Sequence, residues 1–133
     1  MSGTPSVSRR GLVLEIGTGR RLGCDLRRHL SPRTVGLITR SLPLSGNAHR
    51  MGKSIIYIET AIDSGLERER SEFKKGDVAF LPSTGSVCFF LNDVASANKM
   101  TPIGRLVGDV RLLEDAGPST PLSIRDAAAS GAS

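Results

Sequence analysis

The 133-residue chain has little of the material from which catalytic centres are most often built. It contains no Trp, one Tyr, four Phe, two Cys and two His. Its cysteines, Cys24 and Cys88, form no C-x-x-C pair, so neither the usual zinc-ligand spacing nor a disulfide framework is present. No Gly-x-Ser-x-Gly turn displays a nucleophilic serine either. These absences argue against hydrolytic and metal-dependent catalysis, and we expect neither a metal nor a cofactor.

Long apolar runs are also missing. No run approaches the about 18 residues that a membrane-spanning helix needs, and residues 1–10 lack the apolar core of a secretion signal. We therefore expect a cytoplasmic protein that does not enter the membrane. Both cysteines lie among apolar residues and are expected to be buried, Cys88 above all. The sequence does not decide whether Cys24 and Cys88 form a disulfide with each other.

Length and composition favour one folded domain that buries its core without stabilising disulfides or metal ions. Because aromatics are scarce, that core must depend on Leu, Ile and Val, within a hydrophobic content of 38%. We expect a flexible basic segment over residues 1–10, the folded domain over 11–126 and a loose tail over 127–133.

The net charge of +5 comes from 18 Lys and Arg against 13 Asp and Glu. The excess lies early in the chain, where it suits the phosphates of RNA or DNA. It also suits a solvated basic surface that keeps the protein soluble, and this second interpretation is favoured because no aromatics interleave with the arginines as base stacking requires. The arginines concerned are Arg9, Arg10, Arg20, Arg21, Arg27, Arg28, Arg33, Arg40 and Arg50.

Short apolar segments separated by Gly and Pro predict strands. Leu12, Leu14 and Ile16 alternate with other residues as in a strand, and a turn at 17–19 returns the chain into a second strand over 20–26. Residues 44–52 and 61–75 are expected to be loops, the second with charged residues that suggest a solvated loop or a short helix. Further strands are predicted over 54–60, 77–81, 87–91, 103–107 and 122–125.

One helix is clearly indicated, from Ser31 to about Leu42. Ser31 is suited to cap the free N–H groups, Pro32 fits the first helical position, and Pro43 ends the helix. Residues 110–116 permit a short second helix. About seven short strands with one clear helix predict a mainly β protein, a closed or nearly closed barrel with the helix against one opening.

Several segments resemble cyclophilins and occur in the family's order. Residues 31–35 are similar to the family's Ala-Pro-x-Thr-Val helix start, residues 85–91 to its Gly-Ser-Gln-Phe-Phe-Ile strand with one extra residue, and residues 103–110 to its Phe-Gly-x-Val-x-x-Gly segment. Residues 75–82 (Lys-Gly-Asp-Val-Ala-Phe-Leu-Pro) resemble still more the small bacterial and archaeal cyclophilin-like proteins of unassigned function. Residues 42–58 resemble another run of those proteins, and the resemblance covers roughly residues 11–126. It implies a cyclophilin-like closed barrel.

The resemblance also implies a site. Arg50, in His-Arg, takes the place of the catalytic arginine, which donates a hydrogen bond to the prolyl nitrogen as amide resonance is lost. Phe90 takes the place of the pocket phenylalanine. The other family positions are changed: Ile55 and Ile58 stand for a phenylalanine and a glutamine, Cys88 for a glutamine, and Met100 falls near a histidine.

The leading hypothesis is a cyclophilin-like binding domain for a proline-containing peptide or small ligand, with weak or absent peptidyl-prolyl isomerase activity. The polar side chains that would bind a peptide are replaced at Ile58 and Met100, while an apolar pocket around Phe90 remains. One alternative is a basic accessory protein of an RNA or ribosomal particle. Another is a genuine prolyl isomerase, supported by Arg50. The sequence does not decide whether the protein is an enzyme.

Overall fold

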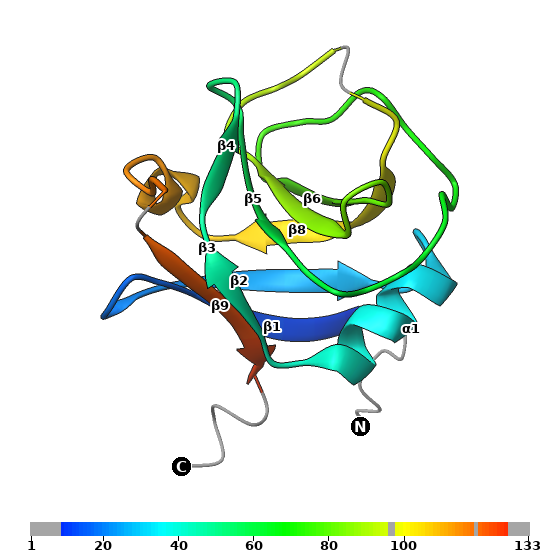
Figure 1. Ribbon diagram of the computed structural model, residues 1–133, viewed down its shortest axis with the longest axis horizontal. Helices are drawn as coiled ribbons and strands as arrows, with labels where there is room; N and C mark the ends of the chain where they lie inside the picture. The colour runs from blue at the N-terminus through cyan, green and yellow to red at the C-terminus, as the bar shows by residue number, and fades with distance from the viewer. Residues whose placement is uncertain (1–8, 96–97, 119, 128–133) are drawn as a thin grey trace.

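The computed structural model describes residues 9–95, 98–118 and 120–127 (Figure 1). Within them, strands form one antiparallel sheet in the order β3-β9-β1-β2-β8-β6-β7-β5-β4. The protein is mainly β, as predicted. The strands are β1 Arg9–Ile16, β2 Arg20–Arg27, β3 Leu44–Asn47, β4 His49–Met51, β5 Ile55–Glu59, β6 Asp77–Leu81, β7 Ser86–Phe90, β8 Thr101–Val107 and β9 Pro121–Asp126.

The segment from Leu44 to Met51 closes the sheet into a nearly complete barrel. Its first half, β3, pairs with β9, and its second half, β4, pairs with β5, so one segment bridges the two edges of the sheet. Only Ala48 separates the halves, and its buried N–H donates to the carbonyl oxygen of Thr120 at 2.8 Å. The expectation of a loop over 44–52 is therefore wrong. Its Ser, Gly and Asn residues form strands because both neighbours supply backbone partners.

Helix α1 spans Pro32–Ser41, one residue inside each predicted boundary. Val35 and Ile38 belong to the core inside the barrel, so α1 covers one opening of the barrel (Figure 1). The predicted second helix is a single 3₁₀ turn, η1, over Val110–Leu113. No helix of the described residues is long and apolar enough to cross a membrane.

The cap of α1 differs from the prediction. The Ser31 hydroxyl makes no capping bond and donates to the carbonyl oxygen of Leu30 at 2.7 Å. The Glu67 carboxylate caps the helix instead. It accepts from the backbone N–H groups of Arg33 at 3.1 Å and Thr34 at 2.8 Å, and from the Thr34 hydroxyl at 2.9 Å. A residue far along the chain thus satisfies the free donors of the first turn.

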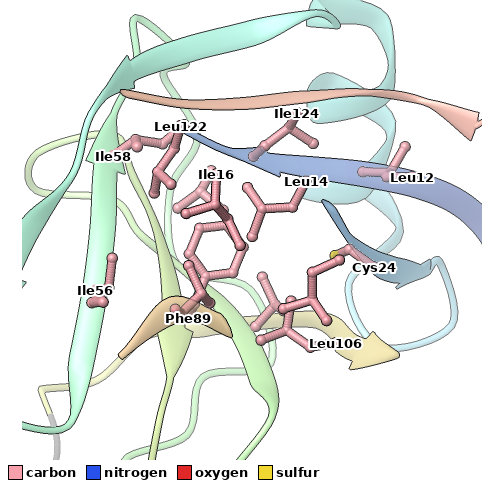
Figure 2. Close-up of a cluster of buried hydrophobic side chains, with 14 of the residues drawn as sticks. Leu12, Leu14, Ile16, Cys24, Ile56, Ile58, Phe89, Leu106, Leu122 and Ile124 are labelled. Carbon is pink, nitrogen blue, oxygen red and sulfur yellow. The ribbon is translucent and has the colours of Figure 1, made fainter. Parts of the chain in front are cut away.

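Apolar side chains form two separate groups because β5, β6 and β7 are covered on both faces. The interior core fills the barrel, and Figure 2 shows its side chains converging from both halves of the sheet. The outer cluster lies on the outside of the same three strands. In β7 the two groups alternate, with Phe89 in the interior core and Phe90 in the outer cluster. The buried members of the outer cluster are Ile55, Phe73, Ala79, Leu81, Cys88, Phe90 and Met100.

Two glycines are required by close backbone contacts. A Cβ on Gly104 would lie 2.0 Å from the carbonyl oxygen of Asp25, where β8 meets β2. Gly85 has a φ of +65°, and a Cβ there would lie 2.7 Å from the carbonyl oxygen of Thr60. Any side chain at Gly104 would push two paired strands of the barrel apart.

The described residues test the expected domain boundaries only in part. Arg9 and Arg10 begin β1, ahead of the expected strand start. Residues 1–8 and 128–133, most of the two expected terminal segments, lie outside the described residues. The expected disulfide alternative is wrong, since Cys24 and Cys88 are free and both buried. Cys24 belongs to the interior core and Cys88 to the outer cluster, so the sheet separates them.

Candidate functional site

Four of the six residues predicted to form a site come together in the outer cluster. Ile55 on β5 and Phe90 on β7 are direct cross-strand partners, and Cys88 lies two residues before Phe90 on the same face. Met100 reaches the cluster from the segment before β8. All four side chains are buried. The alternation of β7 explains the arrangement, because residues two apart point to the same side of a sheet.

The other two residues lie elsewhere. Ile58 is three positions after Ile55 on one strand, so its side chain points to the opposite face and joins the interior core (Figure 2). Arg50 is the cross-strand partner of Ile56, another interior residue, and directly paired residues share a face. The Arg50 guanidinium therefore lies on the other face from Phe90. Its Nε donates to the carbonyl oxygen of Ala116 at 3.1 Å, and its Nη2 donates to that of Glu114.

Two segments outside the barrel cover the outer cluster. They run before β6 and before β8 and pair with each other through two antiparallel bridges, Arg70 with Met100 and Phe73 with Val94. Each bridge has both backbone hydrogen bonds, all at 2.9 Å. We call the described residues of these two segments, 66–75, 92–95 and 98–100, the cover.

Phe73 brings the aromatic ring of the cover into the cluster, which Met100 enters from the other segment. Its ring stacks on the Phe90 ring with 4.5 Å between centroids and 19° between planes. The Arg70 guanidinium carbon lies 5.8 Å from the centroid of Phe73, near the outside of the stack. Phe73 is 1% exposed although it belongs to a highly charged stretch. Sequence reasoning missed this residue, for which the signal was a lone aromatic among charged neighbours.

The cluster is apolar throughout. Its buried members carry no charged side chain, and the only polar hydrogen is on the Cys88 thiol. Burial raises the pKa of Cys88 to about 12, so this thiol stays protonated and is a poor nucleophile. Charged side chains begin on the outside of the cover. There a depression of about 520 Å³ is lined by Glu69, Arg70, Ser71, Glu72, Lys74 and Lys99.

Glu67 fastens the start of the cover to the barrel. Its carboxylate caps α1, and its backbone N–H donates to the Thr101 hydroxyl at 3.0 Å. Partial burial raises the pKa of Glu67, but the hydrogen bonds from Thr34 and Arg33 outweigh burial and the pKa lies below its usual value. Nothing in the sequence indicates this role, because Glu67 stands in a run of alternating charges, 33 residues after Thr34, whose N–H it caps.

The described residues contain no group of three or more His, Cys, Asp or Glu placed to hold a metal ion. The outer cluster is an apolar face that a ring or a branched side chain can contact, and the Phe73 ring closes it. Together with the fold, this defines a small antiparallel barrel with a covered apolar face on three adjacent strands.

The comparison with family sequences agrees with this class. The sequence matches the cyclophilin-like family over residues 11–125, and the chain therefore belongs to the cyclophilin-like family. No curated protein matches the sequence.

Several solved structures share the fold. The hypothetical protein AF2241 from Archaeoglobus fulgidus superposes with a TM-score of 0.70 at 22% identity, over 94% of this chain and 99% of its own. McbB in complex with tryptophan superposes with a TM-score of 0.74 at 18% identity, over 86% of this chain and 44% of its own. At these identities the likeness concerns the fold, and the present chain matches less than half of McbB.

Proposed function

We propose that this protein is a cyclophilin-like binding domain whose ligand site is the outer cluster, with weak or absent peptidyl-prolyl isomerase activity. Its ligand is a proline-containing peptide or a small molecule that presents an apolar ring. One observation carries the proposal: the Phe73 ring stacks on Phe90, and thereby takes the position that a ligand ring would occupy. A ligand binds when the cover moves and Phe73 leaves.

The energetics suit exchange of one ring for another. A fully buried aromatic side chain removes about 150–250 Å² from water, which at about 25 cal/mol per Å² amounts to roughly 4–6 kcal/mol. A ligand ring stacked on Phe90 would gain a similar amount, while the protein would lose the contacts of Phe73. The apparent affinity therefore depends on how often the cover is open.

Weak isomerase activity follows from the place of Arg50. Loss of amide resonance at a prolyl bond is helped by a hydrogen-bond donor aimed at the prolyl nitrogen, and a fixed guanidinium is suited to that task. Arg50 lies on the opposite face from Phe90 and its donors are engaged by the carbonyl oxygens of Ala116 and Glu114. A misplacement of about 1 Å already costs about a hundredfold in rate.

Two free, buried thiols suit a reducing compartment, and we propose the cytoplasm as the location of the protein.

Titration of the protein with ring-bearing probes tests the binding site. The probes are a short proline-containing peptide and L-tryptophan, and the readout is the methyl NMR signals of Ile55 and Met100. We expect Phe73→Ala to bind at least one probe about tenfold more tightly than the unchanged protein, because the competing ring is gone. Leu66→Ala is the matched control, since Leu66 lies in the cover but is 42% exposed and outside the cluster. If neither probe shifts these signals in Phe73→Ala, the proposed site is wrong.

A protease-coupled isomerisation assay tests the second half of the proposal. We expect activity far below that of an ordinary cyclophilin, unchanged by Arg50→Ala. Activity comparable to an ordinary cyclophilin that disappears in Arg50→Ala would instead support the genuine isomerase and would require Arg50 to turn toward the ligand.

A further inference from the structure

The barrel end next to the start of α1 carries a concentration of arginines that the ligand site does not use. Arg9 and Arg27 are direct partners at the ends of β1 and β2. Arg28 lies in the turn that leads into α1, where its carbonyl oxygen accepts from Ser31 at 3.1 Å, and Arg33 lies in the first turn of the helix. The Arg68 guanidinium donates to the carbonyl oxygen of His29 in the same turn. We call these five residues the arginine end.

Carboxylates neutralise only part of the arginine end. Asp25 pairs with Arg9, and the Glu67 carboxylate is occupied with the N–H groups of α1. In the described part of the chain, no ion pair engages the side chains of Arg27, Arg28 or Arg33. The Nε of Arg27 is buried without a hydrogen-bond partner among the described residues.

The residue types at this end fit phosphate groups. All five cations are arginines, whose planar guanidinium binds phosphate through two parallel hydrogen bonds. The lysines of the chain lie elsewhere, in the β4–β5 turn and in the cover: Lys53, Lys74, Lys75 and Lys99. Arg28 and Arg33 are exposed, so both guanidinium groups are accessible to a phosphate.

We propose that the arginine end binds the phosphate backbone of a nucleic-acid duplex without reading its sequence. A duplex is favoured over a single strand because none of the five arginines has a Phe, Tyr or Trp beside it in sequence, and single strands are held by stacking of bases on such rings. It is favoured over a membrane surface because an interfacial site needs several apolar side chains to insert. Leu66 and Val107 are the large apolar side chains exposed among the described residues, and only Leu66, two residues before Arg68, is close in sequence to the arginine end. The proposal does not depend on the ligand site.

The test measures binding of a labelled RNA duplex to the full chain by fluorescence anisotropy, between about 50 and 200 mM salt. With about three to five phosphates contacted, the logarithm of the affinity should fall with the logarithm of salt with a slope of about −3 to −4.5. Arg28→Ala/Arg33→Ala removes two contacts, so we expect the slope to flatten by about 1.8 and the affinity to fall at least tenfold in low salt. An equal affinity for a DNA duplex is expected, because the backbone charge is shared.

The matched control is Arg20→Ala/Arg21→Ala. These exposed arginines begin β2 directly after the β1–β2 turn, and the rise per residue of a strand puts them roughly 20 Å from Arg9 and Arg27. The control removes the same charge and should change affinity less than twofold. Equal losses in both double variants would overturn the proposed surface. So would a flat salt dependence, tighter binding of single-stranded RNA, a preference above tenfold for one kind of duplex, or binding to vesicles of phosphatidylserine and phosphatidylcholine but not to duplexes.

Discussion

Two apolar layers share the strands β5, β6 and β7, and they are closed in different ways. The interior core is surrounded by the barrel and by α1, so Phe89 can meet water only when paired strands separate (Figure 2). The outer cluster is closed by the cover, which is held by two bridges, by the Phe73–Phe90 stack and by Glu67. Adjacent residues of one strand thus belong to one layer that holds the fold and one layer that can open locally.

This difference explains why the outer cluster is the better candidate for a site. Opening the interior requires loss of sheet hydrogen bonds and amounts to unfolding the domain. Opening the cover requires the loss of four backbone hydrogen bonds at its bridges, together with exposure of the buried Phe73 and Met100 side chains. Regions that bind ligands are drawn from the parts of a protein with low local stability. Substitutions and labelling that act on one layer at a time test this difference.

The largest effect should come from the interior core. We expect Phe89→Ala to lower the free energy of unfolding by about 3–5 kcal/mol, because a buried aromatic is lost and the closed barrel cannot collapse around the cavity. This is a large share of the about 5–15 kcal/mol that stabilises a typical domain. Urea denaturation followed by circular dichroism measures it. Phe89→Leu keeps most of the volume and should cost less than about 2 kcal/mol. A loss below that value for Phe89→Ala would mean that the interior is not the more rigid layer.

A smaller and local effect is expected in the outer cluster. Phe73→Ala should cost about 2 kcal/mol, less than Phe89→Ala, because the cover can settle into part of the space left by the ring. Hydrogen exchange should become faster in residues 69–74 and 92–95 and stay slow in β1 and β2. Leu66→Ala, an exposed position of the same segment, should change stability by no more than about 0.5 kcal/mol. Faster exchange throughout the sheet would show that the two layers open together.

The Glu67 cap should make stability depend on pH. The pKa of Glu67 is lowered in the folded protein, so its contribution is complete above the ordinary glutamate pKa of 4.5 and is lost as pH falls through the lower folded pKa. We expect Glu67→Gln to cost about 1 kcal/mol near neutral pH, the usual size of a cap. The difference from the unchanged protein should shrink below pH 4.5. Urea midpoints from pH 7 to pH 3 measure this, with Glu72→Gln, an exposed residue of the cover, as control. A difference that stays constant over this range would exclude the carboxylate as its cause.

The two cysteines compare the layers without any substitution. Burial raises the pKa of Cys24 and of Cys88 to about 12, so both should react slowly with a thiol reagent in the native protein. In urea below the unfolding transition, Cys88 should be labelled before Cys24, since its layer opens locally. Mass spectrometry of the labelled protein assigns the site. Labelling of Cys24 first, or rapid labelling of Cys88 without urea, would contradict the order of opening inferred here.

Local patterns in the sequence determined much of the fold. The alternation through Leu12, Leu14 and Ile16, the turn after them and the Ser31–Pro32 helix start all describe contacts between near neighbours, and the structure confirms the hairpin and α1. The resemblance to cyclophilins led to the family, which the match over residues 11–125 shows. It also led to four apolar residues that meet on one face, although their binding role stays a prediction.

Tertiary structure alone decided the rest. Leu44 to Met51 has no strand signal and forms two strands because the sheet edges on both sides need partners. Arg50 and Ile58 point away from Phe90 because register sets the face on which each side chain lies, and register depends on distant strands. The sequence pattern places Phe73 and Glu67 in a charged loop. They become a buried ring and a helix cap because folding brings Phe90 and Thr34 beside them, and such contacts between distant residues leave no periodic trace along the chain.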